Sequence, residues 1–132
     1  MHSHFDPAKC QTVSEILSRI GDKWSVLIIM KLGSGPSRFS DLKRSVVGIS
    51  QRMLTLTLRA LERDGLVSRT VHPTIPPSVV YELTDLGRSL WKPIEAVGGW
   101  VFCNHEKIYE ARAEFDSRYA TSEEDSAEIQ DR

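Results

Sequence analysis

Side chains that can read DNA bases recur at helical spacing within residues 50–64. Gln51, Arg52 and Thr55 fall on the first turn and a half of this predicted helix, where base edges would lie. Arginine can bridge two guanine acceptors, glutamine can pair with adenine, and a threonine methyl can touch a thymine methyl. Arg59, one turn further along the same face, is better placed for a phosphate. The pattern therefore predicts a helix that enters the DNA major groove.

Further polar and basic side chains flank this predicted helix. Arg38, Lys43 and Arg44 come from the helix before it, and Arg69 and His72 come from the hairpin after it. Each arginine by itself is more simply a solvated surface charge, but the whole set on one motif favours a polyanionic partner. The expected DNA-binding set is Arg38, Ser40, Lys43, Arg44, Ser50, Gln51, Arg52, Thr55, Arg59, Arg69 and His72.

The surrounding sequence predicts a winged helix-turn-helix. A short helix over residues 40–46 and the helix over residues 50–64 are joined by the turn Val47-Gly48-Ile49, and Gly65 ends the second helix. Two strands follow up to Leu83, around a tip whose prolines prevent ladder pairing. Short helix, three-residue turn, longer helix and β-ribbon is the order of this motif. The predicted fold class is mainly α with a small β-hairpin wing (α+β).

Apolar residues at helical spacing predict the helices that support this motif. The seam of residues 50–64 comprises Leu54, Leu58 and Leu61, packed with Ile49 and Met53. An earlier stripe, Val13, Ile16, Leu17 and Ile20, predicts a helix that Gly21 ends, and Asp22 would cap the next helix. Thr84 or Asp85 would cap a last long helix with the stripe Leu86, Leu90, Ile94, Val97, Val101 and Ile108. Pro93 and Gly98-Gly99 predict a kink or break within this last helix.

Length and composition fit one globular domain. The 132 residues are 40% hydrophobic and 27% charged, with no apolar run of transmembrane length and no start typical of a signal peptide. We therefore expect a cytoplasmic protein with no membrane partner. The expected organisation is a flexible N-terminus (residues 1–9), a winged helix-turn-helix domain with dimerisation helices (residues 10–113), and an acidic tail (residues 114–132) that is disordered or a frayed helix.

The net charge of −1 hides an asymmetry between the tail and the rest of the chain. Residues 114–132 contain seven acids and two bases, which leaves fifteen bases against eleven acids in residues 1–113. The tail therefore masks a basic body, as a DNA-binding domain requires.

In several segments the sequence resembles the HxlR family of winged-helix bacterial transcriptional regulators. The likeness extends from about Cys10 to Trp100. It is carried by Gly21-Asp22-Lys23-Trp24, Arg38-Phe39-Ser40-Asp41-Leu42, Gly48-Ile49-Ser50-Gln51-Arg52-Met53-Leu54-Thr55, Leu58-Arg59-Ala60-Leu61-Glu62-Arg63-Asp64-Gly65-Leu66-Val67, and Pro76-Pro77-Ser78-Val79-Val80-Tyr81-Glu82-Leu83-Thr84 with Gly87.

The resemblance implies a homodimer that binds double-stranded operator DNA and represses or activates a neighbouring gene, on the bacterial nucleoid when bound. The helix matching residues 50–64 would enter the major groove, and the hairpin matching residues 67–83 would touch phosphate or the minor groove. Two such helices would read a pseudo-palindrome. The first and last helices would build the dimer interface, for which we expect Val13, Ile16, Leu17, Leu90, Trp91, Ile94, Val97, Trp100 and Val101.

This chain departs from the pattern of the family at three positions. Gln11 stands where proline usually follows the N-terminal cysteine, and Val80 stands where an acidic residue commonly precedes the strand tyrosine. Leu56 occupies a position that is usually polar. It could touch a thymine methyl or widen the core seam, and we favour the seam.

Cys10 is the candidate redox sensor. It lies just before the first predicted helix, whose N-terminal end, together with Lys9, would favour a thiolate. Some members of the family sense oxidants or electrophiles through a cysteine at this position. The alternative is an inert thiol that is buried by packing at the dimer interface, in a regulator that responds to a small molecule instead. Cys103 is a weaker candidate.

Other functional classes have less support. A winged helix that binds protein would not need the basic face. No nucleophile–base set, phosphate-binding glycine loop or metal-ligand spacing indicates an enzyme, so we expect no catalytic residue, cofactor or metal. Aromatic residues could line an effector pocket, but core and interface packing explains them more simply. These are Trp24, Trp91, Trp100, Phe102 and Tyr109.

Overall fold

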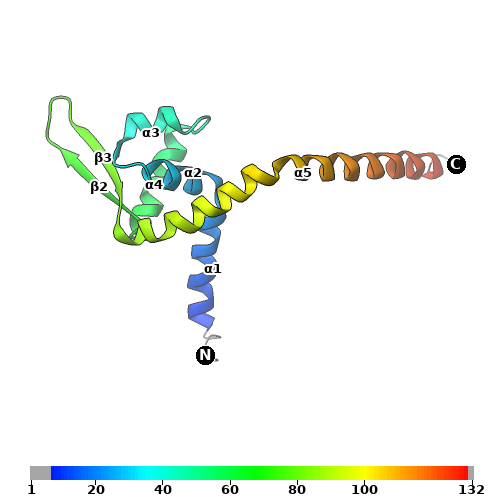
Figure 1. Cartoon of the computed structure of the whole chain (residues 1–132), viewed down its shortest axis with the longest axis horizontal. Helices are drawn as coiled ribbons and strands as arrows, with labels where there is room; N and C mark the ends of the chain where they lie inside the picture. The colour runs from blue at the N-terminus through cyan, green and yellow to red at the C-terminus, as the bar shows by residue number, and fades with distance from the viewer. Residues whose placement is uncertain (1–6, 131–132) are drawn as a thin grey trace. The chain divides into compact units, whose positions relative to one another are not determined.

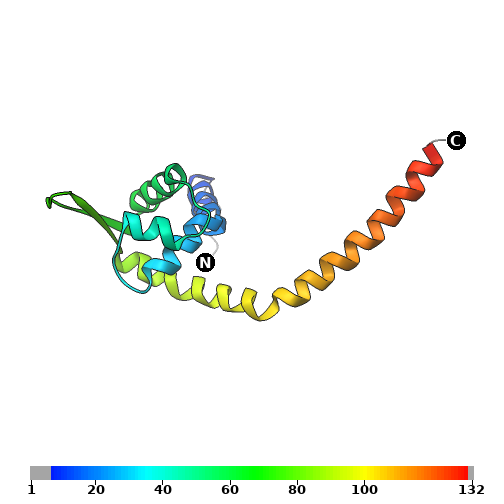
Figure 2. The same cartoon turned by 90° about the horizontal axis from the view of Figure 1, so that it is seen from above.

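The computed structural model describes residues 7–130, and the side chains of residues 7–120, in two compact units, Met1–Glu95 and Ala96–Arg132. The elements of the first unit are α1 (Pro7–Gly21), α2 (Lys23–Leu32), β1 (Ser37–Arg38), α3 (Phe39–Ser45), α4 (Gln51–Arg63), β2 (Val67–His72) and β3 (Ser78–Leu83). Helix α5 (Asp85–Gln130) begins in the first unit and forms the described part of the second. Figures 1 and 2 both show the β2–β3 ribbon as an arm that extends from the helices of the first unit. The predicted winged helix-turn-helix is confirmed, with helix bounds within one residue of those expected for α3 and α4.

The wing belongs to a three-stranded antiparallel sheet with the order β1-β3-β2 in the described part of the chain. β2 and β3 pair from Val67 with Leu83 to His72 with Ser78, and the prolines lie in the tip between them. The sequence does not predict β1, because two residues have no periodicity of their own. β1 pairs Arg38 with Val80. Arg38 therefore lies in a strand, which corrects its placement on the preceding helix.

Side-chain caps begin three helices where the sequence predicts them. Asp22 Oδ2 accepts from the backbone N–H three residues on at 3.2 Å, at the start of α2. Ser50 Oγ does the same at 3.0 Å for α4, and Thr84 Oγ1 at 3.0 Å for α5. Of the two caps proposed for the last helix, Thr84 is therefore the one used. Each oxygen satisfies an N–H group that the start of a helix leaves unpaired.

Gly65 ends α4, as predicted. Its φ of 75° lies in the left-handed region, which glycine adopts without steric cost. The Gly65 N–H donates to the Glu62 carbonyl, and the Leu66 N–H donates to the Leu61 carbonyl, each at 3.0 Å. This pair of bonds satisfies carbonyls at the end of the helix and turns the chain directly into β2.

The core forms around the leucines of α4. Leu54, Leu58 and Leu61 are at most 1% exposed and belong to a single buried cluster with apolar side chains of α2, α3 and the sheet. Two details of the predicted seam are wrong. Met53 is 39% exposed and Leu56 is 51% exposed, because the neighbouring elements cover only the side of α4 that carries the three leucines.

The first turns of α5 pack on the core of their own chain. A Cβ on Gly33 would lie 1.9 Å from Trp91 Nε1, so the indole covers the Gly33 backbone directly. Leu90 and Trp91 are partly buried against the core, and Ile94 is 4% exposed. Ile94 is thus a core residue, which corrects its placement in the predicted dimer interface.

Helix α5 is continuous through Pro93 and Gly98-Gly99, so of the predicted kink or break the break does not occur. The helix also runs through residues 114–130, the part of the expected tail that the structure describes. Glutamate, alanine and arginine favour helix, and each glycine costs only about 1 kcal/mol relative to alanine. Of the predicted flexible N-terminus, residues 7–9 begin α1, and residues 1–6 lie outside the described residues, as do 131 and 132. Among the described residues, no helix is both long and apolar enough to cross a membrane.

The junction between α4, β2 and α5 leaves no room for a side chain at Gly87. Thr84 Oγ1 donates to the Gly65 carbonyl at 2.6 Å, and the Thr84 N–H donates to the Leu66 carbonyl at 3.1 Å. A Cβ on Gly87 would lie 2.0 Å from that same Leu66 oxygen. The bond from Thr84 holds this oxygen in place, so it cannot move aside freely.

We predict that Gly87→Ala lowers the free energy of unfolding by about 1–3 kcal/mol, the usual cost of forcing an extra carbon into a packed site. Denaturant unfolding followed by circular dichroism measures the change. Gly99→Ala is the matched control on the same helix, because a Cβ there meets nothing within 4 Å. Equal stabilities of wild type and Gly87→Ala would contradict the packing described.

Candidate nucleic-acid interface

Helix α4 presents an arginine-rich face opposite its buried seam. With about 3.6 residues per turn, positions 52, 59 and 63 lie within about 40° of one another around the helix. Arg52, Arg59 and Arg63 are all exposed, whereas Leu54, Leu58 and Leu61 on the other side are buried. Within the described residues, none of the three guanidinium groups has an ion pair. The core therefore holds α4 with its positive side towards solvent.

The predicted base-reading residues of the first turn lie at one edge of this face. Gln51 is exposed and Thr55 is half-buried. Thr55 Oγ1 donates to the Gln51 carbonyl at 2.9 Å, so this hydroxyl proton is used within the helix. Ser50 is exposed, but its oxygen already caps α4. Gln51 and Arg52 are therefore the long polar side chains of the first turn whose donors take part in no hydrogen bond within the described residues.

The side chains before α4 that we expect to contact DNA differ in whether their charge is free to interact with a phosphate. Arg38 in β1 and Ser40 and Lys43 in α3 are exposed. Arg44 is also exposed, but its guanidinium pairs with the Asp41 carboxylate, which partly neutralises it. An exposed pair of this kind is weak, so a stronger anion could displace the carboxylate.

The wing residues do not share one face. Arg69 pairs with Tyr81 and His72 pairs with Ser78 in the β2–β3 ladder, and both Arg69 and His72 are exposed. Successive side chains of a strand point to opposite sides. Since 69 and 72 differ by an odd number, the two side chains leave β2 on opposite faces. The predicted wing contacts therefore divide between two surfaces.

Most of the predicted dimer residues are exposed apolar side chains. Val13, Ile16 and Leu17 form an uncovered stripe on α1, in the first unit. The second unit, described by itself, exposes an apolar set on α5 that includes Val97, Trp100 and Val101. Stripes of this size on a helix are typical of an interface with another protein surface.

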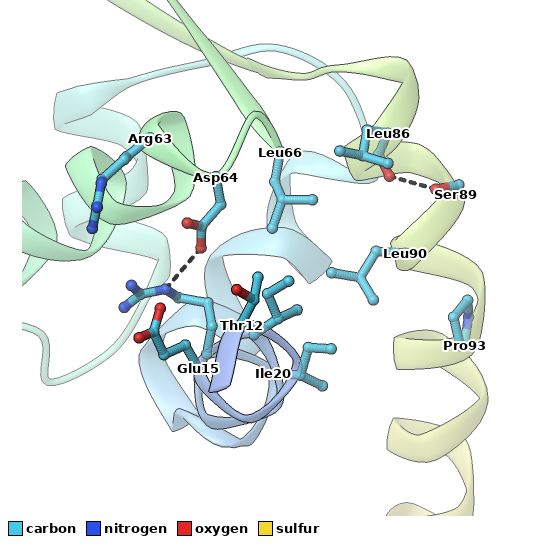
Figure 3. A pocket seen from close by; sticks show the side chains of 12 residues that line it. Thr12, Glu15, Ile20, Arg63, Asp64, Leu66, Leu86, Ser89, Leu90 and Pro93 are labelled. Carbon is cyan, nitrogen blue, oxygen red and sulfur yellow. Dashed lines mark hydrogen bonds and ion pairs between the residues drawn. The ribbon is translucent and has the colours of Figure 1, made fainter. Parts of the chain in front are cut away.

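The structure contains a cleft that the sequence does not predict (Figure 3). Its volume is about 590 Å³, and it lies between α1, the end of α4 and the start of α5. Ile16, Ile20, Leu66 and Leu90 supply apolar walls. At one side Arg19 Nε contacts Asp64 Oδ2 at 3.1 Å, which joins α1 to the end of α4. The aromatic residues considered for a pocket do not form this cleft: Trp24 and Trp91 pack against the core.

Both cysteines are exposed. Cys10 is the fourth residue of α1, within its first turn, and Cys103 lies on α5 in the second unit. Cys10 is not buried within its own chain, and the alternative of an inert thiol packed at a dimer interface concerns a second chain and stays a prediction. The exposure of Cys10 leaves the thiol accessible to reagents, which is a requirement for a sensor.

Two residues of the arginine-rich face were missing from the predicted DNA-binding set. Arg63 is three turns beyond Arg52 on the same side of α4, and Leu56 lies between Arg52 and Arg59. Helical spacing alone places both on this face. Leu56 was assigned to the seam because an apolar side chain is more often buried, and only the packing of the neighbouring elements shows otherwise.

Known proteins resemble this chain over most of its length. The family model described as HxlR-like helix-turn-helix matches residues 19–109. The HTH-type transcriptional regulator YtfH of Escherichia coli (strain K12) is 39% identical over 100 residues, which are 76% of this chain and 79% of that protein. The solved structure of the transcriptional regulator ytfH from Salmonella typhimurium has a TM-score of 0.72 and 38% identity, covering 76% of this chain and 89% of the other. That of the redox regulator HypR in its reduced form has a TM-score of 0.69 and 37% identity, covering 75% and 98%.

Proposed function

Because this chain belongs to the HxlR-like helix-turn-helix family, we propose that it binds operator DNA as a homodimer and regulates the transcription of a neighbouring gene. The relatives named above are transcriptional regulators and not enzymes. The proposed regulator acts in the cytoplasm and needs neither a cofactor nor a catalytic residue. Its sequence specificity resides in α4.

The observation that carries this proposal is the exposed arginine-rich face of α4. Arginine is the side chain that most often reads guanine in the major groove, and Arg52 lies in the first turn of α4, where base edges are reached. Gln51 and Thr55 flank it, and Arg59, one turn beyond Thr55, is better placed for a phosphate. The buried leucines on the other side prevent the helix from rotating this face away.

The remaining exposed side chains supply affinity for the DNA backbone. Arg38, Ser40, Lys43 and Arg44 lie before α4, and Ser50 at its start keeps a hydroxyl proton that a phosphate oxygen can accept. The wing adds Arg69 or His72 from whichever face of β2 turns towards the duplex. Contacts of this kind position a protein on DNA without reading its sequence.

A homodimer would cover the exposed apolar stripes. Val13, Ile16 and Leu17 on α1 and Val97, Trp100 and Val101 on α5 are the residues we assign to this interface, with Leu90 and Trp91 beside them. A two-fold axis between two copies would present two α4 helices to successive major grooves. The operator is then a pseudo-palindrome whose half-sites are about one helical turn, or a multiple of it, apart.

Salt dependence distinguishes this function from a winged helix that binds protein. We expect gel-shift titration with the DNA flanking its own gene to show affinity falling by about a thousandfold between about 50 and 200 mM salt, because phosphate contacts release counterions. A random duplex of equal length is the control and should bind more weakly at every salt concentration. Equal binding of both duplexes, or no binding, would contradict the proposal.

Substitutions of Arg52 and Arg69 should affect DNA binding in different ways. We expect Arg52→Ala to cost about 1–3 kcal/mol on the specific operator and to relax its specificity, because a base contact is lost. Arg69→Ala should weaken specific and random DNA alike, because it removes a phosphate contact. Titrations of both variants against both duplexes measure the difference. An equal loss on specific and random DNA for Arg52→Ala would remove it from the base-reading set.

Cys10 is the proposed sensor of oxidants. Its exposure in the first turn of α1 supports this role, as does the likeness to a protein that is itself described as a redox regulator. Cys10 lies six residues before Ile16 on the helix that we assign to the dimer interface. A change at this thiol would therefore act on the relative placement of the two α4 helices. The alternative is a regulator that responds to a small molecule, for which the 590 Å³ cleft beside α1 is the supporting observation.

Cys103→Ser is the matched control for Cys10→Ser in a test of oxidant sensing. We expect the thiol oxidant diamide to change operator affinity by at least about tenfold, the usual scale of coupling between an effector and a binding site. Cys10→Ser should abolish this response and Cys103→Ser should keep it, as gel-shift titration before and after diamide would measure. An unchanged affinity of the oxidised wild type would end the redox proposal and favour the small-molecule alternative.

A further inference from the structure

Leu56 is an apolar side chain at one edge of the arginine-rich face, between Arg52 and Arg59 along the helix axis. It follows Arg52 by four residues and precedes Arg59 by three, so the three positions lie within about 60° around α4. Leu56 is 51% exposed, whereas the other leucines of α4 are at most 1% exposed. An exposed leucine by itself is unremarkable. Leu56 differs because it lies between two arginines that have no ion pair within the described residues. We therefore ask which binding partner would contact all three side chains.

The described part of the chain does not cover Leu56. Within the described residues, Leu56 is absent from the buried cluster and from the side chains packed against it. It also lies on the opposite side of α4 from the buried seam, and it is not among the residues that line the cleft beside α1. Neither core packing nor a ligand in that cleft therefore explains it.

The chemistry of the face limits what its partner can be. The arginines select a polyanion, and a leucine side chain has no hydrogen-bonding group with which to read donors or acceptors. In the major groove of DNA, the apolar group that protrudes from a base edge is the 5-methyl of thymine, and apolar side chains contact it. DNA with a thymine between the positions contacted by Arg52 and Arg59 would therefore match this face. Its phosphates are negatively charged, like the partner that the arginines select, and its thymine methyl is apolar, like Leu56.

We propose that Leu56 is a specificity-determining residue that recognises a thymine 5-methyl group in each operator half-site. This inference rests on the proposed DNA-binding function and adds to it a particular base and a particular contact. Arg52 and Arg59 hold the flanking base or phosphates, and Leu56 excludes water from the methyl group. Cytosine, which lacks the methyl, would leave the leucine side chain in contact with a polar amino group.

Replacement of thymine by deoxyuridine tests this contact, because it removes the methyl group and leaves base pairing unchanged. Duplexes that the wild-type protein prefers are first selected from a random library, and each thymine is then replaced singly by deoxyuridine. We expect one position in each half-site at which the replacement weakens wild-type binding about fourfold, the fold-change that corresponds to burial of one methyl group. Leu56→Ala should bind the two duplexes equally.

Met53→Ala is the matched control, because Met53 is also an exposed apolar residue of α4 but lies about 60° further round the helix. This variant should keep the fourfold preference for thymine. Both substitutions replace exposed side chains by a good helix former, so circular dichroism should show the wild-type fold.

Four results would overturn the inference. If no deoxyuridine position weakens wild-type binding, or if Leu56→Ala keeps the preference, then Leu56 does not read thymine, although specific DNA binding stands. If Met53→Ala alone loses the preference, the contact belongs to Met53. If the wild-type protein selects no preferred duplex at all, the proposed function fails, and the role of Leu56 fails with it.

Discussion

Burial of Leu54, Leu58 and Leu61 is the interaction on which the rest of this structure depends. These three side chains are almost completely removed from water among apolar residues of α2, α3 and the sheet. Full burial of one leucine is worth about 1.5–3 kcal/mol, so rotation of α4 about its axis would cost several such contributions. The same constraint that stabilises the core therefore fixes which residues face outward. The arginines of α4 are oriented by the leucines behind them.

A second constraint fixes the position of helix α4 relative to the wing and to the start of α5. Gly65 closes α4, Leu66 begins the path into β2, and Thr84 links the end of β3 to both of them before it caps α5. Gly87 then brings α5 against the Leu66 carbonyl with no space between them. The reading helix, the wing and the first turns of α5 are thus held at one junction. A displacement of the start of α5 would be transmitted to α4 by backbone contacts and not by flexible side chains.

The charges of the chain are arranged to suit this geometry. The net charge of −1 for the whole chain conceals an excess of basic residues before residue 114. Seven of the fifteen bases before residue 114 lie on α4 and on the segments next to it, and the acids of residues 114–130 belong to α5. Asp41 and Asp64 moderate individual arginines by pairing with them, namely Arg44 and Arg19. The arginines of α4 have no ion pair among the residues that the structure describes, and they are the ones that the buried leucines hold outward.

The sequence did not predict β1 and left the cap of α5 open between Thr84 and Asp85. It did by itself determine the order of the helices and the two wing strands, the caps at Asp22 and Ser50, the end of α4 at Gly65, the leucine seam and the arginine spacing. All of these are local properties, set by residue type and by the period of the helix or strand. Only the tertiary structure decided whether a given apolar residue is covered. It exposed Met53 and Leu56, buried Ile94 and placed Trp91 on Gly33, and it paired Arg38 in β1. The physical reason is that burial depends on which distant segments pack against a residue, and a local pattern contains no information about them.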